Sequence, residues 1–253
     1  MTPKQRIKHI VSWIKDYARS NKICTLVVGV SGGIDSAVVS TLCAKTGLPV
    51  IAVSMPIHQS KHTHSLSVAQ GQWLVQNFEN VRHRMVDLTP TFRQFERIWD
   101  GASELGLANT RARLRMMTLY QIAQDESGIV VGTGNRVEDF GVGFYTKYGD
   151  GGVDISPIGD CLKTQVWDMG RELGVLQAII DAPPTDGLWH DGRTDEDQLG
   201  MTYPELENAM RLDKLMHDSI EQMSMTAKEK KQLKRYREIR ARNLHKMQPI
   251  PVC

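Results

Sequence analysis

Short apolar runs alternate, along the first half of the chain, with longer segments in which apolar positions recur at helical spacing. The short runs predict strands and the longer segments predict helices. We expect strands at 25–30, 49–54, 81–86 and 128–132, and helices at 7–18, 36–45, 65–78, 92–99 and 110–124. Because a helix separates each strand from the next, the pattern predicts an α/β fold: a doubly wound parallel sheet flanked by helices, with a ligand crevice at the carboxyl ends of its strands.

A turn of serine and glycine follows the first predicted strand. The segment 29–36 reads GVSGGIDS and leads into an apolar helix. Its glycines let the backbone come close to a ligand, so successive N–H groups can point at an anion near the helix N-terminus. Asp35 adds a carboxylate, which suits a phosphate site if a divalent cation bridges the two. The loop therefore predicts a site for metal-bound nucleotide, made of Gly29, Val30, Ser31, Gly32, Gly33, Ile34, Asp35 and Ser36.

Two other phosphate loops do not fit these letters. A Walker A loop requires a lysine that GVSGGIDS lacks, and the dinucleotide fingerprint GxGxxG fails in its second half. A turn that only reverses the chain would not need three polar side chains. The stretch SGGIDS instead resembles the loop of the ATP pyrophosphatases, which cleave ATP between its α- and β-phosphates and pass AMP to a substrate oxygen.

A second candidate element follows the fourth predicted strand. In VGTGNRVED, residues 131–139, Thr133 can offer a hydroxyl to phosphate and Glu138 can reach a cation shared with Asp35. Magnesium usually takes only one or two protein carboxylates, so this pair predicts an Mg²⁺ site. Thr133 or Asn135 could equally cap a helix that starts here, and both interpretations can hold together.

Composition limits the class of protein. The chain has 253 residues, of which 41% are hydrophobic and 24% charged, and a formal net charge of +2. We expect a single domain, 1–253, and a cytoplasmic protein, because no apolar stretch approaches the roughly 20 residues that span a bilayer. The four cysteines show no CxxC spacing, which favours a reducing compartment without a structural metal. The small net charge does not favour nucleic acid as a partner.

Several separated stretches together resemble the ammonia-dependent NAD synthetases, a family of the N-type ATP pyrophosphatases. They are SGGIDS, NTRARLRMMTLY, GTGNRVED, FYTKYGDGGVDISPI, LKTQVW, PPTDGLWHDGRTDEDQLGMTYPELENAM and NLHK. The resemblance implies an adenine nucleotide α-hydrolase-like, Rossmann-like fold and a homodimer. It also implies a ligase that adenylates deamido-NAD with ATP, releases pyrophosphate, and amidates the acyl-adenylate with ammonia to give NAD and AMP.

The resemblance assigns roles to residues of this chain. It implies that the loop 29–36, Thr133, Lys163 and Thr185 bind ATP, that Asp35 and Glu138 hold Mg²⁺, and that Asp35 and Lys163 act in catalysis. It further implies that deamido-NAD is bound by Arg113, Lys147, Asp154, His245 and Lys246. Where some members carry Asp-His after the GT, this chain has Gly134–Asn135. Arg111, Arg113 and Arg115 fan over about 200° of a helix, so they cannot all face one ligand.

The residue types suit that chemistry, and alternatives remain. Activating a carboxylate with ATP brings two anions together, so fixed cations such as Lys147 and Lys163 and a metal ion must offset their repulsion. No second catalytic layout for a glutaminase is visible, which favours free ammonia as the nitrogen donor. Another ATP pyrophosphatase of nucleotide or tRNA modification, using the basic tail 228–246, or a nucleotide-binding sensor would share parts of this pattern.

Overall fold

A four-stranded parallel sheet forms the centre of the protein. The computed structural model describes residues 1–253 except 100, 186, 188, 190–192 and 219–224. The strands are β1 (Thr25–Gly29), β2 (Val50–Ser54), β3 (Val81–Met85) and β4 (Gly128–Val130), and they pair in the order β3-β2-β1-β4. The strand order therefore reverses beside β1, between β1 and β4. In sheets of this kind ligands bind in the crevice at that switch point.

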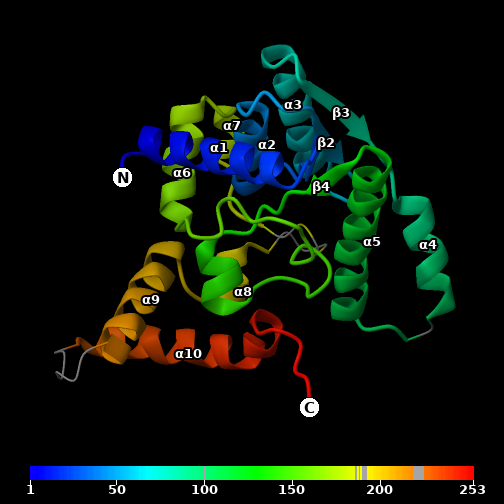
Figure 1. The fold of residues 1–253 in the computed structure, drawn as a ribbon. Coiled ribbons are helices and arrows are strands. Elements are labelled where there is room, and N and C mark those ends of the chain that lie inside the picture. The colour runs from blue at the N-terminus through cyan, green and yellow to red at the C-terminus, as the bar shows by residue number, and fades with distance from the viewer. Residues whose placement is uncertain (100, 186, 188, 190–192, 219–224) are drawn as a thin grey trace.

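Helices cover both faces of the sheet, as the alternating pattern predicted (Figure 1). One face packs against α1 (Pro3–Ser20), α2 (Ile34–Ala44), α3 (Lys61–Asn77), α6 (Lys163–Leu173) and α7 (Gln177–Ile180). The other face packs against α4 (Thr89–Ile98) and α5 (Glu104–Asp125). Alternate residues of the strands point to opposite faces, so Leu26 and Val28 join the first core while Val27 joins the second.

A third layer lies below the carboxyl ends of the strands. It contains a short π-helix, η1 (Arg136–Val142), with α8 (Asp195–Leu199), α9 (Tyr203–Asp218) and α10 (Ala227–Met247). Figure 1 shows α8, α9 and α10 on this side of the sheet. The elements of this layer share a separate apolar cluster around Val137, Tyr203 and Leu206. Between this layer and the sheet lies the crevice in which the candidate site is found.

The expected strands and helices are present, with shifted ends. The first helix extends N-terminally because Thr2 and Gln5 form a capping box around Pro3. Its apolar stripe of Ile7, Ile10 and Ile14 is buried in the core and so is unavailable for an interface. No helix within the described ranges is long and apolar enough to cross a membrane.

Candidate functional site

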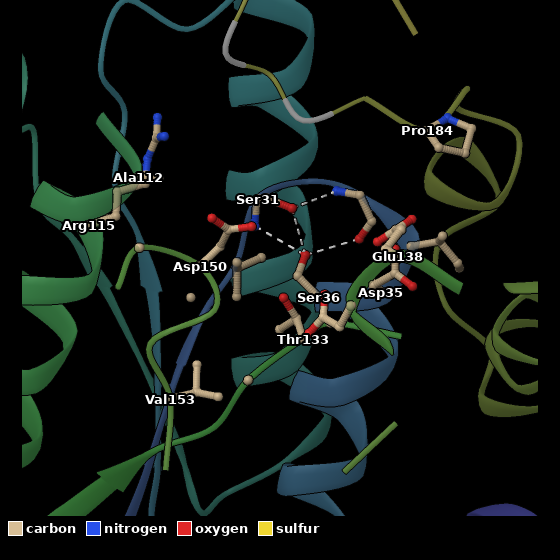
Figure 2. A pocket seen from close by; sticks show the side chains of 18 of the residues that line it. Ser31, Asp35, Ser36, Ala112, Arg115, Thr133, Glu138, Asp150, Val153 and Pro184 are labelled. Atoms are coloured by element: carbon tan, nitrogen blue, oxygen red, sulfur yellow. Dashed lines mark hydrogen bonds between the residues drawn. The ribbon is translucent and has the colours of Figure 1, made fainter. Parts of the chain in front are cut away.

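The phosphate loop leaves β1 and enters α2 with its own hydroxyl groups holding its shape. The Ser31 amide donates to Ser36 Oγ over 3.1 Å, the Gly33 amide donates to Ser31 Oγ over 3.2 Å, and Ser36 Oγ donates to the Gly33 carbonyl over 3.0 Å. Gly32 has a φ of 93°, which only glycine adopts readily. The serines therefore shape the turn as well as facing the crevice (Figure 2).

Lys163 joins the two carboxylates that were expected to share a cation. Its Nζ donates to Asp35 Oδ2, and to Glu138 Oε1 over 2.9 Å, and the side chain is only 2% exposed. Burial alone would lower the pKa of Lys163, but the two carboxylates outweigh it and raise that pKa. Burial opposes ionisation of Glu138 as well, yet the charge of Lys163 keeps the pKa of Glu138 below its usual value. The centre is thus a charged ammonium between acidic groups.

Asn135 both caps the helix that follows β4 and holds a carboxylate of the acidic centre. Its Oδ1 accepts the amides of Val137, over 2.9 Å, and Glu138, over 3.1 Å, and so caps η1. Its Nδ2 donates to Asp35 Oδ1 over 3.1 Å. The cap therefore also fixes Asp35 relative to Glu138, across 100 residues of sequence.

Tyr203 and Asp195 belong to this centre, and sequence reasoning missed both. The Tyr203 hydroxyl donates to Glu138 Oε1 and lies 3.2 Å from Asp195 Oδ2. Burial and then the neighbouring carboxylates raise the pKa of the phenol, so it stays protonated and can donate. Tyr203 begins α9 and Asp195 begins α8, and no spacing in the chain links either of them to the loop at residue 35.

One pocket of about 250 Å³ collects the expected ATP-binding residues. Asp35 and Glu138 lie side by side in it, next to Ser31, Ser36 and Thr133 (Figure 2). The lining includes every residue assigned to ATP except Gly32, namely Gly29, Val30, Ser31, Gly33, Ile34, Asp35, Ser36, Thr133, Lys163 and Thr185. Thr185 is also held internally, because its hydroxyl donates to the Arg193 carbonyl over 3.2 Å. Part of the same stretch, 186, 188 and 190–192, lies outside the described residues.

Further residues line the pocket that sequence reasoning did not select. Asp139 and Asp150 face it, and burial raises the pKa of both carboxyls. A Cβ on Gly134 would overlap the Asp139 carboxylate, so the glycine after Thr133 makes room for that side chain. Arg115 is the arginine of its cluster that lines this pocket, and its Nε donates to the Met55 carbonyl over 3.0 Å.

The residues assigned to deamido-NAD lie beside the pocket and are not among its lining residues. Arg113 donates to the Lys147 carbonyl, Lys147 Nζ donates to the His245 carbonyl over 3.3 Å, and Lys246 Nζ donates to the Tyr145 carbonyl over 2.7 Å. These bonds fasten the segment 145–147 to α5 and to the end of α10. Asp154 is separate, because its carboxylate accepts the Val130 amide over 2.7 Å and the Tyr120 hydroxyl over 3.1 Å.

The carboxylates of the centre fit a hard divalent cation. Asp35 and Glu138 offer oxygen ligands alone, which is the donor type that Mg²⁺ prefers, and one or two such carboxylates are the usual protein contribution. Within the described part of the chain, no cluster of three or more histidine, cysteine or acidic side chains could enclose a metal. A cation here would therefore need ligands from a phosphate or from water.

The fold and the pocket define an α/β protein with a loop of glycines and serines at the switch point of a parallel sheet. A model of the NAD synthase family matches residues 6–250, and the chain belongs to that family. It is 36% identical over 212 residues to an NH(3)-dependent NAD(+) synthetase of Carboxydothermus hydrogenoformans, covering 81% of this chain and 84% of the relative. A second relative of the same name, from Mesoplasma florum, is 39% identical over 213 residues, covering 82% of this chain and 84% of the relative.

Solved structures agree with this assignment. The NMN synthetase from Francisella tularensis has a TM-score of 0.86 and 33% identity, covering 100% of this chain and 99% of that one. The NH3-dependent NAD synthetase from Campylobacter jejuni has a TM-score of 0.79 at 21% identity, with both chains covered fully, and so shares the fold. The predicted family and fold class are therefore confirmed.

Proposed function

We propose that this protein is an ammonia-dependent ligase that converts deamido-NAD to NAD with ATP. The carboxylate of the nicotinate ring attacks the α-phosphorus of ATP, an acyl-adenylate forms and pyrophosphate leaves. Ammonia then attacks the acyl carbon, the amide forms and AMP leaves. The observation that carries the proposal is the Asp35–Lys163–Glu138 centre beside the phosphate loop, in a member of the NAD synthase family.

The residues of the chain supply position and charge for the first step. The loop 29–36 presents backbone amides at the N-terminus of α2, where they and the helix dipole favour phosphate. Lys163 keeps its positive charge in the buried centre and can offset the charge that develops on the phosphates. No nucleophilic serine or cysteine is required, because the attacking oxygen belongs to the substrate.

We further propose that Asp35 and Glu138 hold Mg²⁺ when ATP is bound. The ion would neutralise the polyphosphate and so make the inner bridge easier to break. Two features support this proposed Mg²⁺ site. The carboxylates offer oxygen ligands alone, and hydrogen bonds from Asn135 and Tyr203 fix their positions.

A second candidate substrate is the mononucleotide. The Francisella tularensis protein that resembles this chain over its full length is an NMN synthetase, and forming that amide by the same chemistry would start from nicotinate mononucleotide. The reactive centre would serve either substrate. We expect the amide of deamido-NAD to form at the higher kcat/KM when both acids are assayed under identical conditions with ATP and ammonia. A kcat/KM at least tenfold higher for nicotinate mononucleotide would make the mononucleotide the substrate, and amidation of neither acid would refute the function.

We propose free ammonia as the nitrogen donor, as in the names of the curated relatives. The rate at fixed total ammonium should rise with pH, because the neutral amine is the nucleophile. Glutamine at the same concentration should give little amide in a preparation free of partner glutaminase. Equal turnover with glutamine alone would contradict the proposal.

A homodimer in the cytosol is the proposed working state. In the described part of the chain, α4, the residue after it and α5 carry the exposed apolar side chains Phe95, Ile98, Trp99, Leu105 and Met117. Phe95 and Met117 line a shallow depression, and this apolar surface suits a second copy. Sedimentation equilibrium that gives only monomer at micromolar concentration would contradict it.

Small molecules remain the proposed partners, with no nucleic acid and no membrane. The alternative of another nucleotide- or tRNA-modifying pyrophosphatase is not favoured by the relatives.

A further inference from the structure

A buried chain of hydrogen bonds runs from β3 to the phosphate loop, away from the pocket. Ser67 Oγ on α3 lies 2.7 Å from the Val30 carbonyl and 2.7 Å from Ser54 Oγ at the end of β2. Ser54 Oγ in turn lies 2.9 Å from Nε2 of His83 on β3. Both serines are fully or almost fully buried, so water does not complete these bonds.

The number of available protons decides which group donates in each of these hydrogen bonds. A carbonyl oxygen only accepts, so the single hydroxyl proton of Ser67 is used on Val30. All three contacts are hydrogen bonds at once only if Ser54 donates to Ser67, and then no proton of Ser54 remains for His83. The bond between Ser54 and His83 must therefore come from an Nε2–H group of the imidazole. Burial lowers the pKa of His83, which favours the neutral ring and leaves its other nitrogen without a proton.

This series of hydrogen bonds ends on the peptide between Val30 and Ser31, at the start of the phosphate loop. Ser67 holds the carbonyl of the Val30–Ser31 peptide, while Ser36 Oγ holds its N–H over 3.1 Å. The preceding amide, of Val30, donates to the Val53 carbonyl over 2.8 Å. This peptide plane joins two residues that line the pocket, and it is fixed from α3 on one side and from α2 on the other.

Two glycines bring the chain and the loop together. A Cβ at Gly71 on α3 would overlap the His83 ring, so the ring reaches Ser54 only because position 71 has no side chain. A Cβ at Gly32 would lie 2.6 Å from the Thr63 carbonyl and 2.9 Å from the Ser67 amide. The phosphate loop therefore rests directly on the start of α3, the helix that carries Ser67.

We propose that His83, Ser54 and Ser67 are positioning residues for ATP: a fixed Nε2–H donor orients two serines that hold the phosphate loop in its binding shape. The inference rests on the proposed function insofar as the loop binds the phosphates of ATP. His83 acts through the serines and does not touch the substrate.

A pair of substitutions at His83 tests the proposal. His83→Leu removes the donor and His83→Gln keeps an N–H donor at a similar reach. We expect His83→Leu to raise the KM for ATP about fivefold, the fold-change of one lost hydrogen bond, with the KM for the nicotinate substrate unchanged. His83→Gln should stay within about twofold of the unaltered protein. An unchanged KM for ATP in His83→Leu, or equal shifts in both KM values, would overturn the proposal.

A spectroscopic measurement on the unaltered protein keeps the test independent of folding and of activity. Long-range ¹H–¹⁵N spectra should show His83 as the Nε2–H tautomer. The Nδ1–H tautomer would make His83 the acceptor from Ser54 and would overturn the proposal. Binding of a non-hydrolysable ATP analogue, measured by calorimetry, should weaken in His83→Leu and not in His83→Gln. If the unaltered protein binds the analogue but forms no amide, the proposed function fails while this inference stands.

Discussion

Replacing Asp35 by asparagine should abolish most of the pyrophosphate release, with a fall in kcat/KM on the order of 10³-fold, as for loss of a single charge-stabilising group in other active sites. Asp35 is the acidic side chain of the phosphate loop, and it lies with Glu138 around Lys163. Asparagine keeps the shape and removes the charge that a magnesium ion would bind. The rate is measured as pyrophosphate formed from ATP in the presence of the nicotinate nucleotide. Activity within tenfold of the unaltered protein would remove the proposed metal role.

Matched variants separate chemistry from folding. The oxygen of the new amide can still accept from Lys163, so the circular dichroism spectrum and the melting temperature of Asp35→Asn should change little. Asp35→Ala should lose the same activity while the fold survives. Tyr203→Phe removes the hydroxyl that donates to Glu138 and lies beside Asp195, and a loss of about 10- to 100-fold is expected for a group that orients a metal ligand. A larger loss for Tyr203→Phe than for Asp35→Asn would contradict this order of roles.

Replacing Lys163 by methionine should destabilise the protein as well as inactivate it. Methionine fills most of the volume but leaves Asp35 and Glu138 together in a buried site without their shared cation. Removing one partner from a buried ion pair typically costs about 3–5 kcal/mol. Urea unfolding at neutral pH should show that loss in the free energy of unfolding, and amide formation should become undetectable.

The dependence of stability on pH should reverse in this variant. In the unaltered protein the raised pKa of Lys163 contributes to the free energy of unfolding. This contribution is complete below about pH 10.4 and is lost as the pH rises through the folded-state pKa. The lowered pKa of Glu138 makes a second contribution, which is complete above about pH 4.3 and is lost as the pH falls through the folded-state pKa of Glu138. Without Lys163 the carboxylates repel each other and their pKa values rise, so Lys163→Met should gain stability as the pH falls from neutral through those raised values.

Lys163→Arg serves as the control, because it keeps the charge and changes the shape. It should retain more stability than Lys163→Met and should not gain stability in acid. A methionine variant as stable as the unaltered protein at neutral pH would contradict the role given to this centre.

Local patterns were sufficient to predict the sheet and half of the site. β1 and β2 are apolar runs because parallel strands inside the sheet are buried on both faces, and that signal needs no tertiary information. β3 reads VRHRM and lies at the edge of the sheet, where its polar side chains are partly exposed. The loop 29–36 and the segment around Thr133 and Glu138 each follow an apolar strand, so strand prediction also placed them at one edge of the sheet.

The remaining parts depend on contacts that no local pattern encodes. Tyr203 reaches Glu138, and Asp195 reaches Tyr203, only because α8 and α9 fold back under the sheet. Whether Arg113 or Arg115 lines the main pocket depends on how α5 is rotated about its axis, since the two side chains point about 200° apart. The structure directs Arg115 into the main pocket and Arg113 into the depression between α4 and α5. The stretch between α7 and α9 also contains the short helix α8, which a capping box at Thr194 begins.

Activation of the carboxylate requires that ATP is cleaved between its α- and β-phosphates. Phosphorus NMR of a reaction containing the protein, ATP, magnesium, ammonia and the nicotinate nucleotide identifies the products directly. We expect AMP and pyrophosphate in equal amounts, matched by the amide formed and absent without the nicotinate nucleotide. ADP and orthophosphate as the products would contradict it.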